Sequence, residues 1–214
     1  MNNNNKIKKN MKKVIWFWIM LLSSLAVHSA EISYREISLR DKTCGQIYEE
    51  LVKKTDWYGK QGEGLSINYA NLPAIIKPIT GRELVGIGIN WNSLPVLGIQ
   101  LEFKVPAGKR NWRGVLEYYN HLRHALIGKY GRLNLNNEVI MSPYSRFDSD
   151  DELENAYILG YISYTSGFFD YDTRTSVMVE IQDDWRVTVT FRDVNQEDVI
   201  YRWKSALGVV YDDM

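Results

Sequence analysis

The sequence predicts an α+β fold: a single two-layer domain in which an antiparallel sheet, built from two β-hairpins, carries about three helices packed mainly on one face. Three observations support this prediction: two pairs of alternating segments, a long amphipathic helix between them, and no interior linker rich in Pro, Gly or Ser. The chain has 214 residues, of which 45% are hydrophobic, so it is long enough to bury a core.

The first predicted hairpin covers residues 85–105. Apolar residues occupy every second position in residues 85–91 and again in 97–105, and residues 92–95 form the turn between them. Such alternation is typical of half-buried antiparallel strands, with one face toward a core and the other toward solvent. Gly86, Gly88 and Gly98 then fall on the outer face of this hairpin.

The second predicted hairpin covers residues 177–191. Val177, Val179 and Ile181 alternate with polar residues, and Asp183 and Asp184 form a short turn. The alternation resumes at Trp185 and continues to Phe191, so this hairpin also has one apolar and one polar face.

A helix is predicted between the hairpins, with Asn111 as its N-cap and Gly131 as its C-terminal stop. Its apolar side falls within an arc of roughly 80° and consists of Trp112, Val115, Tyr119, Leu122, Leu126 and Tyr130. The opposite stripe is polar and consists of Arg113, Glu117, Asn120, His121 and His124.

The remaining elements have weaker patterns. Helices are expected over residues 44–54 and 196–207, and strands over residues 34–39 and 156–164. Residues 132–155 have neither period and are rich in Asn, Ser and Asp, so a long surface loop is expected there.

Residues 1–30 have the pattern of a cleavable secretory signal peptide. Five lysines precede an apolar stretch from Val14 to Val27, and small residues follow it. The apolar stretch is shorter than the ~20 residues that span a bilayer, so no membrane span is expected after cleavage. Loss of those lysines leaves 21 basic and 26 acidic residues, a net charge of −5. We therefore expect a periplasmic or secreted protein that does not bind nucleic acid.

Cys44 is the single cysteine, so no intramolecular disulfide can form. Thr43 and Gln46 fit a capping box, which places the thiol in the first turn of a helix, where the helix dipole stabilises a thiolate. Cys44 is therefore a candidate catalytic nucleophile, although a cysteine hydrolase also needs a histidine nearby as its base. The alternative is a partly buried thiol with no chemical role.

Glu117, His121 and His124 lie on one stripe of the predicted helix 112–130. Two imidazoles and a carboxylate could bind zinc and leave a fourth position open. The alternative is a solvated polar face, because histidines in dedicated zinc helices are usually spaced four residues apart.

An acidic cluster lies at Asp148, Asp150, Asp151, Glu152 and Glu154. Calcium prefers such oxygen-rich loops, but the spacing does not match an EF-hand. A solvated loop is the expected interpretation. No pattern for a cofactor is present, since the sequence has no P-loop, dinucleotide fingerprint or HExxH motif.

The most unusual feature is an aromatic segment at residues 157–171. Aromatic side chains are enriched at binding surfaces and also dominate protein cores, so both interpretations stay open. The candidate binding residues are those of this segment and of the glycine patch on the first hairpin: Tyr157, Tyr161, Tyr164, Phe168, Phe169, Tyr171, Gly86, Gly88 and Gly98.

These observations favour an exported, non-enzymatic protein that binds another protein or cell-envelope macromolecule, for example as an inhibitor or immunity protein. One alternative is a small envelope hydrolase that uses Cys44 or a metal at His121 and His124. Another is a structural component of a secreted assembly.

Overall fold

The computed structural model describes residues 33–80 and 91–193. The chain divides into two units, Met1–Glu31 and Ile32–Met214, and every described residue belongs to the second. The predicted signal peptide, the predicted helix 196–207, and Gly86 and Gly88 of the first predicted hairpin lie outside the described residues.

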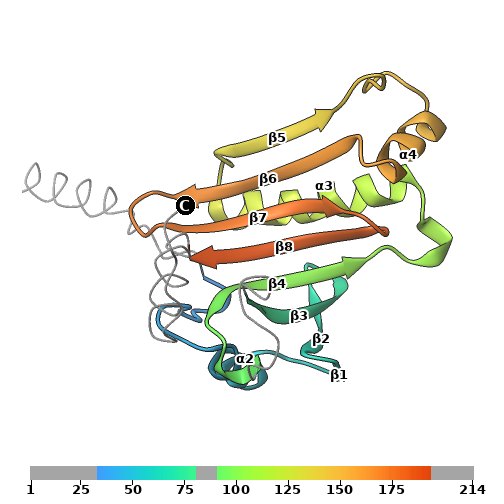
Figure 1. Ribbon diagram of the computed structural model, residues 1–214. Helices are drawn as coiled ribbons and strands as arrows, with labels where there is room; N and C mark the ends of the chain where they lie inside the picture. Colours follow the sequence, from blue (N-terminus) through green and yellow to red (C-terminus); the bar gives the residue numbers. More distant parts are fainter. Residues whose placement is uncertain (1–32, 81–90, 194–214) are drawn as a thin grey trace, which may run out of the picture. The chain divides into compact units, whose positions relative to one another are not determined.

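The described residues form an α+β fold with one open antiparallel sheet, as the sequence predicts (Figure 1). The strand order is β1-β2-β3-β4-β8-β7-β6-β5, and each neighbouring pair is antiparallel. The strands are β1 (Gly59–Gln61), β2 (Gly64–Tyr69), β3 (Leu72–Thr80), β4 (Val96–Lys104), β5 (Leu135–Ile140), β6 (Ile162–Asp170), β7 (Thr175–Gln182) and β8 (Arg186–Asp193).

The strand register divides the sheet into a core face and an outer face. Phe103 of β4 lies opposite Val187 of β8, which lies opposite Ile181 of β7, and side chains in such rows share one face. The neighbouring row joins Glu102, Thr188 and Glu180 on the other face. The core face thus carries the apolar members of each strand, whereas the outer face is mostly polar over β4, β7 and β8.

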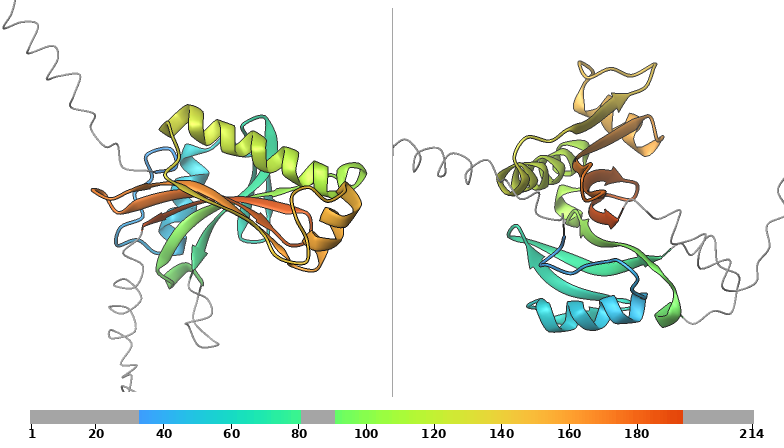
Figure 2. Two further views of the ribbon diagram at one scale, coloured as in Figure 1. Left: turned by 90° about the horizontal axis from the view of Figure 1, so that it is seen from above. Right: turned by 90° about the vertical axis from the view of Figure 1, so that its left-hand side faces the viewer.

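Three α-helices lie in the described ranges: α2 (Cys44–Lys54), α3 (Trp112–Tyr130) and α4 (Asp150–Ile158). Two short 3₁₀ turns, η2 (Trp91–Ser93) and η3 (Ala107–Lys109), precede β4 and α3. Helix α3 runs along one face of the sheet (Figure 2). Buried residues of the three helices join those of the strands in one hydrophobic core. Within the described ranges, no helix is long and apolar enough to cross a membrane.

Helices α2 and α3 begin where their caps predict. The Asn111 side chain accepts a hydrogen bond from the Gly114 amide at 2.8 Å, and α3 ends before Gly131, which has a φ of 82°. At α2, Thr43 and Gln46 form a reciprocal capping box. In both helices the caps satisfy backbone donors that the first turn leaves unpaired.

The second predicted hairpin is confirmed as β7 and β8, but its turn is longer than expected. Trp185 lies in the turn and not in the strand, and both Asp184 and Trp185 have positive φ, of 56° and 57°. Although Trp185 lies in the turn, its ring packs against the core beside Tyr157. This burial explains why an apolar residue at this position continues the alternation of the strand.

Of the first strand predicted for the first hairpin, residues 85–90 lie outside the described residues, and Trp91 lies in η2 and not in a strand. Among the described residues, β4 is paired with β3 on one side and with β8 on the other. The hairpin partner of β4 is β3, whose buried Ala74 and Ile76 share the core face. Alternation identifies a strand but does not determine which apolar strand lies beside it.

Three further segments differ from the sequence prediction. Residues 34–39 are not a strand: residues 34–37 form a tight turn closed by a Tyr34–Ile37 bridge, in which Arg35 and Glu36 have positive φ. Residues 132–155 are not one long loop, because they contain β5 and the first turns of α4. The strand expected at 156–164 begins only at Ile162, because α4 extends to Ile158.

Candidate protein-binding surface

Strand β5 is an edge of the sheet, because it is paired with β6 and is last in the strand order. By register, Leu135 and Val139 point to the outer face, opposite Gly167 and Ser163 of β6. Met141 continues the same alternation. These residues are 38%, 40% and 44% exposed, respectively, so they form an apolar row on a face of β5 that none of the described helices covers.

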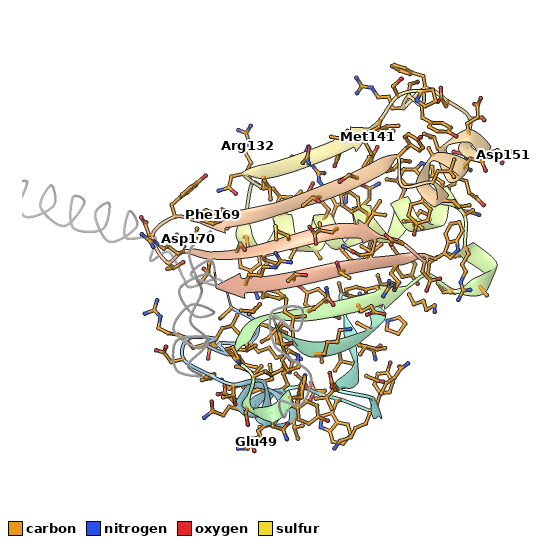
Figure 3. All side chains as sticks on the ribbon, viewed as in Figure 1. Glu49, Arg132, Met141, Asp151, Phe169 and Asp170 are labelled. Carbon is orange, nitrogen blue, oxygen red and sulfur yellow. The ribbon has the colours of Figure 1, made fainter. Side chains whose placement is uncertain are left out.

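Aromatic residues of β6 and its flanks continue this apolar row. The Met141 amide donates a hydrogen bond to the Tyr161 carbonyl at 2.8 Å, and the Tyr161 ring lies 5.5 Å from that of Tyr144. Figure 3 places Met141 at the α4 end of β5 and Phe169 at the opposite end of β6. We call Leu135, Val139, Met141, Tyr161 and Phe169 the outer β5–β6 surface.

The aromatic segment 157–171 is divided between the two faces of the sheet. Tyr164 and Phe168 point toward the core face, where Tyr164 contacts Trp112 and Phe168 stacks on Tyr130. Phe169 points to the outer face, and its ring lies 4.5 Å from that of Tyr171, which is 78% exposed. The segment is therefore partly core and partly surface, because successive side chains of β6 point to opposite faces of the sheet.

Tyr157 belongs to the core and holds the β7–β8 turn. Its hydroxyl donates to the Gln182 carbonyl at 2.6 Å and accepts from the Trp185 amide at 2.8 Å. Burial raises the pKa of Tyr157, so this hydroxyl keeps its proton. It is a structural side chain and not part of the exposed surface.

A polar network fixes β5 from the core side. The Tyr119 hydroxyl of α3 lies 2.6 Å from the Ser166 hydroxyl and donates to a Glu138 carboxylate oxygen at 3.1 Å. Ser166 in turn donates to the Asn136 side chain at 2.5 Å, and Arg123 lies 3.8 Å from Glu138. Burial is the main reason that the pKa of Tyr119 is raised. This network joins α3, β5 and β6 and holds the edge strand in place.

Asn134 fixes the start of β5 in a similar way. Its side-chain oxygen accepts from the Phe169 amide at 2.8 Å, and its side-chain nitrogen donates to the Phe169 carbonyl at 2.7 Å. The amide group thereby replaces one backbone pair of the antiparallel ladder. Together with the Met141–Tyr161 hydrogen bond, it secures β5 at both ends.

Gly98 does not lie in an open patch. A Cβ atom on Gly98 would lie 2.5 Å from the Phe191 carbonyl oxygen and 2.9 Å from Cδ1 of Ile79, which is its cross-strand neighbour. The position is glycine because the backbone of β8 and the Ile79 side chain come close. The expectation of a bare surface at Gly98 is wrong.

Cys44 lies at the start of α2, as predicted, but its thiol is buried. Sγ lies 3.8 Å from the Pro95 carbonyl oxygen, and burial raises the pKa of the thiol from 9.0 to about 12. Desolvation outweighs the helix dipole here, so the thiolate is disfavoured at neutral pH. The arrangement is that of a core thiol and does not favour a nucleophile.

The proposed zinc ligands do not converge in the structure. Glu117 pairs with Lys109 at 3.8 Å, His121 Nε2 lies 2.7 Å from the Ala70 carbonyl, and His124 Nδ1 lies 2.7 Å from the Asn120 carbonyl. Over residues 33–80 and 91–193, no three His, Cys, Asp or Glu side chains are placed to hold a metal ion. Each of the three side chains has a neighbour that accounts for its position.

The acidic cluster forms the start of α4 and not an open loop. Ser149 and Glu152 form a capping box, Asp150 pairs with Arg113, and Glu154 accepts from the Trp112 amide at 3.3 Å. Carboxylates are stabilised at the N-terminus of a helix by its dipole and by free backbone amides. The residues therefore have a structural explanation that requires no calcium.

The exposed residues of β5 are those that the sequence interpretation missed. The signal that would have identified them is a period of two through Leu133, Leu135, Val139 and Met141, interrupted by Asn137. The surrounding asparagines hid this pattern, because they are typical of loops.

No protein-family model, curated protein or solved structure matches this chain.

Proposed function

We propose that this protein is exported and binds another protein through the outer β5–β6 surface. The observation that carries the proposal is the row of exposed Leu135, Val139 and Met141 on a strand at the edge of the sheet. Native proteins usually protect an edge strand with charge, proline or a covering element, because an exposed apolar edge associates with other chains. Exposed apolar surface of this kind marks interaction sites.

The chemistry of the surface supports a protein as the partner. Aromatic residues and Met are enriched at protein interfaces, and this surface supplies Tyr161, Phe169 and Met141. The Tyr119 network and the Asn134 side chain hold β5 before any partner arrives. A surface that is already ordered loses little conformational entropy when it binds.

The enzymatic alternative has less support. A cysteine hydrolase requires an accessible thiolate beside a base, whereas Cys44 is buried and its pKa is raised to about 12. The export part of the proposal rests on the pattern of residues 1–30. It predicts that the chain is found outside the cytoplasm in cell fractions and that a chain without residues 1–30 stays inside.

The binding part is tested by affinity capture from the envelope fraction of the cell that makes the protein. The wild-type chain is compared with the double variant Met141→Lys/Tyr161→Lys, which places two charges on the outer β5–β6 surface. Tyr58→Lys is the matched control, because Tyr58 is 62% exposed and precedes β1 at the opposite edge of the sheet. We expect a partner that wild type and Tyr58→Lys retain and the double variant loses. Equal recovery by all three chains would contradict the proposal.

A further inference from the structure

The free edge of β5 presents a row of outward-directed backbone groups that another extended chain can pair. The Met141 amide points to β6, where it meets the Tyr161 carbonyl. Because an antiparallel ladder alternates, Leu135, Asn137 and Val139 also point to β6, and Asn136, Glu138 and Ile140 direct their backbone groups outward. Among the described residues no strand lies on that side of β5.

The two edges of the sheet differ in a way that singles out β5. Strand β1 has three residues, Gly59–Gln61, and its central residue is Lys60, so it is short and charged. Strand β5 has six residues without proline or lysine, and its one charge, Glu138, faces the core side toward Tyr119 and Arg123. Short length and charged side chains are the usual protection of an edge strand. Strand β5 is not short, and it has no charged side chain on its outer face.

We propose that β5 pairs with β5 of a second copy of this chain, antiparallel and about a two-fold axis at Asn137. The edge is used for this contact, and the outer face of both copies stays open, so the inference goes beyond the proposed function and does not replace it. Closed two-fold pairing of one surface with itself is the commonest form of protein oligomer.

The sequence of β5 is complementary to itself in this register. With Asn137 opposite its own copy, the outward-directed residues Asn136 and Glu138 face each other in hydrogen-bonded pairs, as an antiparallel ladder requires. On the outer face, Leu135 comes opposite Val139 of the second copy, and Val139 opposite Leu135. Apolar cross-strand pairs of this kind stabilise a sheet, and they join the two exposed rows into one.

The charges favour the same register. Shifting the axis to Glu138 would place the two Glu138 carboxylates directly opposite each other, which is destabilising. In the Asn137 register each Glu138 instead lies opposite an Asn136 amide.

The inference is tested on the chain produced with its own leader and purified from the exporting cell. Light scattering after size-exclusion chromatography should give twice the mass of one chain. In Asn136→Pro the outward amide is lost, whereas Asn136→Ala loses the same side chain and keeps the amide. We expect the dissociation constant of the dimer to be at least about tenfold higher for Asn136→Pro than for Asn136→Ala. A wild-type monomer at 100 µM, or equal constants for the two variants, would overturn the inference.

A cysteine variant tests the register independently of any loss of folding. Residues directly opposite in a non-hydrogen-bonded pair have Cα atoms about 4.5 Å apart, within the range that a disulfide spans. Asn137→Cys should therefore form a covalent dimer under mild oxidation. Asn68→Cys, an exposed asparagine on the outer face of β2, should not. Cross-linking of both variants to the same extent, or of neither, contradicts the proposed axis.

The outcomes separate this inference from the proposed function. A chain that stays monomeric but captures a partner through Met141 and Tyr161 would refute the dimer and leave the binding proposal standing. A chain that dimerises through β5 but captures no partner would support the dimer and refute the binding proposal.

Discussion

Tyr119 and Ser166 lie 2.6 Å apart, hydroxyl to hydroxyl, and both side chains are fully buried between α3 and the sheet. Ser166 lies opposite Asn136 in the β5–β6 ladder, and Tyr119 also reaches Glu138 on β5. One buried contact therefore connects the central helix to the exposed edge strand. The position of the proposed binding surface depends on it.

Replacing Tyr119 with Phe should lower the free energy of unfolding by about 1–3 kcal/mol, because the buried Ser166 hydroxyl and the partly exposed Glu138 carboxylate each lose a partner. Urea denaturation monitored by circular dichroism measures the change. Tyr171→Phe, which removes a hydroxyl from a side chain that is 78% exposed, should change it by less than about 0.5 kcal/mol. Equal effects of the two variants would show that the network does not stabilise β5.

Tyr157→Phe should loosen the β7–β8 turn. The hydroxyl satisfies both the Gln182 carbonyl and the Trp185 amide, and Trp185 has a positive φ that its neighbours must maintain. We expect a loss of about 1–3 kcal/mol in the free energy of unfolding. Faster hydrogen exchange at the Trp185 amide, measured by NMR, is the specific readout, and unchanged exchange there would contradict the assignment.

Two glycines should respond to alanine with opposite signs. Gly98→Ala places a Cβ against the Phe191 backbone, so the free energy of unfolding should fall by about 1–3 kcal/mol. Gly128→Ala lies in α3, and apart from its chain neighbours and the backbone of its own helix no atom lies within 4 Å of the new Cβ, so this variant should gain about 0.5–1 kcal/mol from helix propensity. Thermal and urea denaturation of both variants checks the signs, and a stabilising Gly98→Ala would refute the close approach of β8.

The Cys44 thiol should be unreactive in the folded chain. Its pKa is raised to about 12 by burial, whereas the thiol of the unfolded chain ionises near 9.0, so unfolding releases a proton between these values. The contribution of Cys44 to stability is therefore constant below pH 9.0 and falls as the pH rises toward 12. The absorbance of a disulfide reagent at pH 8 should show little reaction until urea is added. Rapid labelling of the native chain would contradict the burial of Cys44, and Cys44→Ala should flatten the loss of stability above pH 9.

The sequence alone determined the elements that are specified by neighbouring residues. Asn111 and Gly131 mark the two ends of α3, and the capping box of Thr43 and Gln46 marks the start of α2. The alternation from Val177 to Phe191 identifies β7 and β8. In each case the signal is local: a capping side chain binds a backbone amide a few residues away, or apolar side chains recur at every second position. The α+β class follows from the same local information.

Only the tertiary structure decided which strands pair and which residues remain exposed. Strand β4 takes β3 and β8 as neighbours because several apolar strands compete for the same core face, and alternation does not rank them. Strand β5 has almost no apolar residues on its core face. It is held in place by hydrogen bonds to residues that are distant in the sequence, on α3 and β6: Tyr119, Ser166 and Phe169. The division of the aromatic residues between core and surface depends on this packing as well. The proposed binding surface therefore arises from contacts between segments far apart in the chain, and the interrupted alternation of residues 133–141 does not specify those contacts.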